Sequence, residues 1–547
     1  MNSNSQVYST LSDLVLSDQV YKDKADMLFK LISIMEDHDG LGSPGIFMMI
    51  RPRGFGLSLI SQSIQNLVKI ESDNDDSLNI NTTPKIITTY QSKQNIINNQ
   101  IQSSLSSKES ENTVQNTEAV SKKATESVES EESEESADAK DADSKNKEDT
   151  SILEDIKNYI EDLVSDKKKE EGDDFSDQKS IDEINANASA QELMVTDEID
   201  AIKTFYNVKK RPVLSLDFKH LRAKNPKEFT EGLLDILQEQ FWINHIESHI
   251  DPYQTPKAYF DKLLNELNKK YPSIKISVLI DNYDVPFMVA SEFNHEQCEE
   301  SVCAYLDMLN VIKYSNRTVK WCLISGHINF SLASETSEGL PLVYDLSSEP
   351  MFAALFGFTR DDIKEVYQNE IIRFSENLKI TPEKYLDMLE QCYGGFLFAD
   401  NDEMYNPNCP KMFCPACIAH CMMNNGKLLP YSASGKYDFV KNALKNNPKN
   451  LSWLFGKDGQ DPLFSDSVET DVKGKQLGSL LIQLGFATRT KVIINHSDAY
   501  VTWRYRFEFP NLDMKKTFAY ISGEVTEQDL IKPLEVVIDS TSDYEED

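Results

Sequence analysis

The chain has 547 residues, of which 40 % are hydrophobic, so it could hold about two to four domains or one large domain with insertions. Its formal charge of -34 argues against bulk attraction to nucleic acid or anionic lipid. No stretch approaches the roughly 18 apolar residues of a membrane span, and eight cysteines in so long a chain are not a disulfide framework. We expect a cytoplasmic protein with reduced thiols, although a signal for a specialised secretion machine would escape these tests.

The acidic charge is concentrated in one internal segment and one tail. Residues 71–200 carry 34 acidic and 13 basic side chains, and residues 533–547 carry six acidic side chains and no basic one. Residues 71–150 have Tyr90 as their only aromatic, so they cannot bury enough apolar surface to offset the entropy lost on ordering. We predict a mostly disordered acidic insert over 71–200 and an acidic tail over 526–547.

One part of the insert has a different character. Ile152, Ile156 and Ile160 share one face of a helix, which predicts a helix over 151–165. This helix would either pack on the folded body or form on binding a partner.

Outside the insert, short apolar runs alternate with amphipathic stretches. We predict strands over 45–50, 212–218, 274–281 and 319–326, and helices over 58–68, 226–246, 255–270 and 296–312. Near-continuous apolar strands between helices are typical of a parallel sheet covered on both faces. Farther along, we predict helices over 359–375, 381–391, 435–446 and 472–485, then strands over 491–495 and 500–509.

These patterns divide the chain into five segments. The segments are the first part of an α/β core (1–70), the insert (71–200), the rest of the core (201–358), a helical region with late strands (359–525) and the tail (526–547).

A turn suited to phosphate binding follows the first predicted strand. The sequence RPRGFGLS at 51–58 joins that strand to a helix, whose N-terminal backbone N–H groups can hold phosphate. The usual G-x-x-x-x-G-K-[ST] is not present, because Leu57 stands where the lysine would be.

Three motifs in a fixed order make a resemblance specific. RPRGFGLS (51–58), LIDNYD (279–284) and ISG (324–326) resemble R-P-R-R-F-G-K-S, L-I-D-E-Y-D and the T-G strand end of the bacterial predicted AAA-ATPase-like family. Flanking segments agree at 20–32, 344–367, 393–408, 477–491 and 507–518. The resemblance implies a P-loop NTPase-like parallel sheet followed by a mostly helical region. The nuclease domain that often follows in this family is not expected, because few residues follow the last motif.

The chain departs from the family at three charged positions. Leu57 replaces the lysine that contacts the β- and γ-phosphates. Asn282 replaces the acid that would activate water, and an amide cannot accept that proton. Gly54 replaces the second arginine of the loop. We therefore expect degenerate Walker A and Walker B motifs with no intact catalytic residue.

The magnesium half of the site is retained. Ser58 and Asp281 are the candidate Mg²⁺ ligands, to be used if nucleotide binds. Asp284 is a candidate substitute base, and Asn329 or His327 is a candidate γ-phosphate sensor. The resemblance implies that nucleotide contacts come from Arg51, Arg53, Gly54, Phe55, Gly56, Leu57 and Ser58.

A cluster of cysteines lies later in the chain. Cys409, Cys414, Cys417 and Cys421, with His420, are dense enough for a metal site. Three of these cysteines also have the spacing of small residues buried on one face of a helix, so packing thiols are the favoured interpretation.

The sequence favours an AAA-ATPase-like protein that has lost hydrolysis and acts as a binding or scaffold module for protein partners. Binding of Mg·ATP is expected to be weak or absent. The alternatives are a slow or unconventional Mg-dependent ATPase and a metal-stabilised structural protein.

Overall fold

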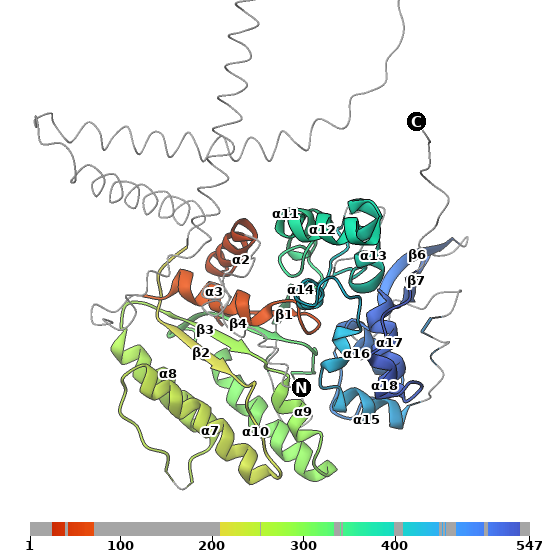
Figure 1. Cartoon of the computed structure of the whole chain (residues 1–547). Helices are drawn as coiled ribbons and strands as arrows, with labels where there is room; N and C mark the ends of the chain where they lie inside the picture. Colours follow the sequence, from red (N-terminus) through yellow and green to blue (C-terminus); the bar gives the residue numbers. More distant parts are fainter. Residues whose placement is uncertain are drawn as a thin grey trace, which may run out of the picture. The chain divides into compact units, whose positions relative to one another are not determined.

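The described residues up to Ile70 and those from Lys209 onward pack together, although the predicted insert separates them in the sequence (Figure 1). The computed structural model describes residues 24–38, 42–70, 208–251, 253–332, 340, 343–398, 409–447, 451, 454–455, 467–496 and 501–536. The predicted insert over 71–200, with its helix over 151–165, lies outside the described residues.

A five-stranded parallel sheet lies at the centre of this unit, which confirms the predicted α/β fold class. Its strands are β1 (Gly45–Ile50), β2 (Val213–Asp217), β3 (Ile276–Asp281), β4 (Val319–Gly326) and β5 (Val343–Asp345), in the order β2-β3-β4-β1-β5. Both β1 and β3 are buried at every position, as their apolar sequences GIFMMI and ISVLID predict.

The strand order places the carboxyl ends of β3, β4 and β1 side by side. Ile50 of β1 pairs with Gly326 of β4, and Ile280 of β3 pairs with Ile324. The connection that leaves β1 leads toward the β2 edge of the sheet, whereas the connection that leaves the neighbouring strand β4 leads toward the β5 edge. The connections from these two adjacent strands therefore reverse direction between β1 and β4. Open parallel sheets bind ligands outside the carboxyl ends of their strands, at such a reversal.

Helices cover both faces of the sheet. On one face are α2 (Ala25–Asp37) and α3 (Leu57–Val68), and on the other are α7 (Pro226–Ile243), α8 (Pro256–Lys270) and α10 (His295–Lys313), with α9 (Val285–Ala290) between β3 and α10 (Figure 1). The side chains of Asn225, Thr255 and Asn294 cap α7, α8 and α10 by accepting from a backbone N–H three residues on.

A buried ion pair joins α2 to the sheet. The Nε and Nη2 atoms of Arg211 donate to the two carboxylate oxygens of Glu36, each at 2.6 Å, and Trp321 Nε1 of β4 donates to the same carboxylate at 2.7 Å. The backbone N–H of Ile70 donates to the carbonyl oxygen of Arg211 at 3.1 Å. The segment that leaves α3 therefore lies beside the segment that enters β2.

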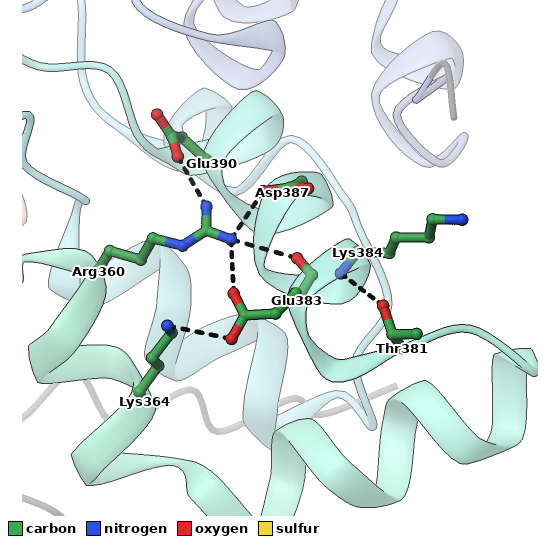
Figure 2. A network of polar contacts seen from close by, with 7 residues as sticks. All are labelled: Arg360, Lys364, Thr381, Glu383, Lys384, Asp387 and Glu390. Carbon is green, nitrogen blue, oxygen red and sulfur yellow. Dashed lines mark hydrogen bonds and ion pairs between the residues drawn. The ribbon is translucent and has the colours of Figure 1, made fainter. Parts of the chain in front are cut away.

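A mostly helical region follows the sheet. It contains η2 (Pro350–Phe352), α11 (Arg360–Val366), α12 (Gln368–Leu378), α13 (Pro382–Tyr393), α14 (Pro415–Met423), η3 (Tyr431–Ser434), α15 (Asp438–Asn446), α16 (Gln476–Gln483), α17 (Leu512–Ser522) and α18 (Glu527–Leu530). Strands β6 (Thr488–His496) and β7 (Val501–Glu508) form an antiparallel hairpin. Figure 2 shows how Arg360 of α11 binds α13, through ion pairs with Glu383, Asp387 and Glu390.

The start of the predicted acidic tail packs on this region. The backbone N–H of Leu534 donates to the carbonyl oxygen of Leu428 at 2.8 Å, and Leu534 is buried. Within the described ranges, no helix has the length and apolar character needed to cross a membrane.

Candidate functional site

The predicted turn follows β1 and leads directly into α3. Gly54 has a φ of 85° and Gly56 a φ of 87°, a left-handed conformation that glycine adopts without strain. Helix α3 begins at Leu57, without a side-chain cap on its N-terminal N–H groups. The structure therefore has the strand, glycine turn and helix N-terminus expected of a phosphate loop.

The two arginines of the loop have different environments. Arg51 is 1 % exposed, and its guanidinium donates to the carbonyl oxygens of Ile50 and Ser347, each at 2.8 Å. The same group lies over the rings of Phe356 and Phe398, and burial lowers its pKa to about 10. Arg51 is thus part of the core, whereas Arg53 is exposed.

Two apolar side chains of the loop are also buried. Leu57, at the position of the family's lysine, is 6 % exposed, and Phe55 is 3 % exposed. The ring of Phe55 packs edge-on against Phe396 and Phe398, with centroids 5.0 and 4.9 Å away. The loop is therefore fixed by apolar packing with the helical region.

Ser58 and Asp281, the predicted magnesium ligands, lie together. The carboxylate of Asp281 accepts from Ser325 Oγ at 2.7 Å and from the backbone N–H of Asn282 at 3.0 Å. The hydroxyl of Ser58 lies close enough to this carboxylate to lower its pKa. Burial raises the pKa of Asp281, while the hydrogen bonds from Ser58 and Ser325 oppose that rise. The sequence reasoning missed Ser325, although its place at the end of the strand next to β3 could have indicated it.

Asn282 lies where the family has its acid. Its backbone has a φ of 53°, and its Nδ2 donates to Asp217 Oδ1 of β2 at 2.8 Å. The amide is held against β2, and it has no proton-accepting group with the basicity of a carboxylate.

The candidate substitute base, Asp284, and the candidate γ-phosphate sensors, His327 and Asn329, have polar contacts with other residues of the protein. Asp284 is fully buried, and its Oδ2 accepts from the backbone N–H of His327 at 3.1 Å. His327 Nδ1 contacts the carbonyl oxygen of Arg51 at 2.9 Å. Asn329 Nδ2 donates to Asp345 of β5 at 3.4 Å. The contact between Asp284 and His327 joins the segments that follow β3 and β4, and the contact between His327 and Arg51 joins the end of β4 to the loop.

A cavity of about 430 Å³ lies beside the loop, between the ends of β1 and β5 and the helical region. Its lining includes Arg51, Asn329, Asp345 and Arg489 but neither Ser58 nor Asp281. The cavity and the Ser58–Asp281 pair are therefore separate features.

The structure brings together only part of the cysteine cluster. Cys414 and Cys417 both lie at the N-terminal end of α14, whereas Cys409 packs against Ala353 and His420 stacks on Tyr431. Across the described ranges, no group of three or more His, Cys, Asp or Glu side chains is arranged to hold a metal ion.

Comparisons with known proteins agree with the motifs. The model of a family described as predicted AAA-ATPase matches residues 182–335, which contain β2, β3 and β4 but not the loop at 51–58. An uncharacterized protein in the vnfD 5' region of Azotobacter chroococcum mcd 1 is 24 % identical over 242 residues, 44 % of this chain and 41 % of that protein. The chain thus matches about two fifths of the length of this relative. Residues 182–335 are thus similar to the family described as predicted AAA-ATPase, and they include three strands of the parallel sheet.

Proposed function

We propose that the chain is a pseudo-ATPase that binds Mg·ATP weakly or not at all and acts as a binding or scaffold module. The observation that carries this proposal is the buried Leu57 at the first position of α3. A lysine at this position would supply a point charge for the β- and γ-phosphates, and a buried hydrocarbon side chain supplies none.

The Walker-B-like end of β3 supports the same proposal. A general base contributes about 10²–10⁴-fold to a reaction rate, and Asn282 cannot act as one. Asp284, the candidate substitute, is 0 % exposed and already accepts the N–H of His327, so it is poorly placed to take a proton from water.

The loop is held by contacts that need no ligand. The backbone N–H of Ala416, at the start of α14, donates to the carbonyl oxygen of Gly54 at 3.3 Å. With Phe55 and Leu57 buried, the turn keeps its shape through protein packing. A loop held in this way suits a scaffold, in which the acidic insert (71–200) and the part of the acidic tail (526–547) after Leu534 would face protein partners.

A slow Mg-dependent ATPase is the second candidate, and the pairing of Ser58 with Asp281 favours it. Hydroxyl and carboxylate oxygens at this edge fit Mg²⁺ when it arrives with nucleotide. The residues present therefore fit the magnesium but not the charge of the terminal phosphates.

The test is titration calorimetry with Mg·ATP on three proteins. The wild type should give no binding at micromolar concentration, and the Leu57→Lys/Asn282→Glu variant should gain measurable affinity because both missing charges return. Leu59→Lys, which adds a cation at a neighbouring position of α3, is the control for non-specific attraction. Micromolar binding by the wild type with Mg-dependent turnover would refute the proposal.

A further inference from the structure

Two cysteines meet at the N-terminal end of α14. Cys414 is the N-cap residue and Cys417 lies three positions later, in the sequence Cys-Pro-Ala-Cys. Residues three apart on a helix share a face, so the two thiols lie on the same side of this helix end. The spacing is typical of thiols that convert between a dithiol and a disulfide.

A buried carboxylate lies next to the second thiol. Cys417 Sγ donates to Asp513 Oδ2 at 3.4 Å, and Asp513 is 1 % exposed. The same carboxylate accepts from Ser432 Oγ at 2.7 Å and from Thr517 Oγ1 at 3.4 Å. Because burial raises its pKa to about 6, Asp513 is mostly ionised at neutral pH and can take the proton of the thiol.

The first thiol touches the loop. Cys414 Sγ lies 3.8 Å from the carbonyl oxygen of Gly54 and 4.0 Å from that of Arg53. A Cβ atom at Gly54 would come within 2.9 Å of this sulfur and 3.0 Å of Ala416 Cβ. The chemical state of Cys414 therefore bears directly on the packing of the loop.

We propose that Cys414 and Cys417 are an oxidation site, a dithiol that hydrogen peroxide closes to a disulfide with Asp513 as the proton acceptor. This inference does not depend on whether the chain binds nucleotide. Peroxide is small enough for thiols whose residues are each 4 % exposed, whereas a bulky disulfide oxidant is not.

The reaction proceeds in two balanced steps. The Cys414 thiolate attacks one peroxide oxygen, the O–O bond breaks, and a sulfenic acid and hydroxide form. Cys417 then gives its proton to Asp513 and attacks the Cys414 sulfur, which forms the S–S bond and expels the sulfenic oxygen as hydroxide. The two protons released by the thiols convert the two hydroxides to water, so two thiols and one peroxide give one disulfide and two waters.

The other cysteines of the cluster are placed less well for this reaction. Cys421 is 0 % exposed, and its sulfur contacts Tyr385 Oη at 3.9 Å. Burial raises its pKa to about 12. The pKa of Cys417 is also raised, first by the neighbouring thiol of Cys414 and then by burial. Cys417 differs from Cys421 because a carboxylate lies next to it.

The test is mass spectrometry of the reduced full-length chain after peroxide treatment and alkylation. The tryptic peptide 412–427 contains Cys414, Cys417 and Cys421. We expect this peptide to lose two hydrogens, to carry one alkyl group at Cys421 and to regain all three alkylation sites after reduction. Full alkylation without reduction, or a disulfide that includes Cys421, would overturn the proposal.

Variants separate the roles of the residues. Cys421→Ser is the matched control and should still form the disulfide, while Cys417→Ser should leave a sulfenic acid at Cys414 that dimedone traps. Asp513→Asn should slow closure by about 10²-fold, as loss of a general base does, and Thr517→Ala, which keeps the carboxylate, should not. An unchanged rate in Asp513→Asn would remove Asp513 from the mechanism. Amide hydrogen exchange at Arg53 and Gly54 should differ between the reduced and oxidised protein, and identical exchange would show that the loop is unaffected.

Discussion

The buried ion pair between Glu36 and Arg211 allows a quantitative test of the fold. Glu36→Gln keeps the shape of the side chain but leaves the guanidinium of Arg211 buried without its counter-charge. Both residues are under a tenth exposed, and the carboxylate receives two bonds of 2.6 Å and one of 2.7 Å. Breaking such a pair costs about 3–5 kcal/mol, so we expect a loss of that size in the free energy of unfolding.

The assay is urea unfolding of the wild type, Glu36→Gln, Arg211→Met and the double variant Glu36→Gln/Arg211→Met. Because the double variant leaves no unpaired charge, it should lose less than the sum of the single losses, with a coupling of about 2 kcal/mol. Lys227→Gln, which removes the exposed pair with Glu231, is the control and should cost below about 0.5 kcal/mol. Additive single losses would refute the assignment of this pair as one coupled unit.

Three further predictions concern other parts of the structure. Replacing residues 71–207 by about eight glycine and serine residues should keep the fold, because the flanking segments are already hydrogen-bonded to each other. The shorter loop should raise the unfolding free energy by at most about 2.5 kcal/mol, and loss of cooperative unfolding would contradict this. Gly54→Ala should cost about 1–3 kcal/mol and more than Gly42→Ala, since both have positive φ but only Gly54 faces crowding at its Cβ position; equal losses in urea unfolding would contradict this. Asp513 has a folded pKa of about 6 against an ordinary 3.8, so the stability that it contributes is present below about pH 4 and is lost as pH rises through about 6. Relative to Asp513→Asn, the wild type should therefore lose about 2 kcal/mol between pH 4 and pH 7, and parallel stability curves would contradict the raised pKa.

The amino-acid sequence was sufficient to predict the strands and helices that have a clear local hydrophobic pattern. The predicted strands 45–50 and 319–326 agree with β1 and β4, because buried parallel strands are continuous apolar runs. The predicted helix 359–375 is two helices, α11 and α12, which meet at Tyr367, where the backbone leaves the helical conformation. β5 was not predicted, since its three residues carry no pattern and it is specified by pairing with β1.

The candidate site was predictable in composition but not in its contacts. The sequence brought Ser58 and Asp281 to one sheet edge, because both follow or end parallel strands. It did not indicate that Arg51 turns into the core or that Cys414 packs on Gly54, because these contacts join residues about 300 or more positions apart. The direction of a side chain at a strand end depends on the packing of distant segments, which no local pattern encodes.

The most direct test of the central claim is phosphate release from Mg·ATP by the wild type and by Asp281→Ala. If Leu57 and Asn282 have removed the charges needed for hydrolysis, both proteins should release phosphate at the background rate. Magnesium-dependent release by the wild type that Asp281→Ala abolishes would show that the site is active, and the pseudo-ATPase proposal would be wrong.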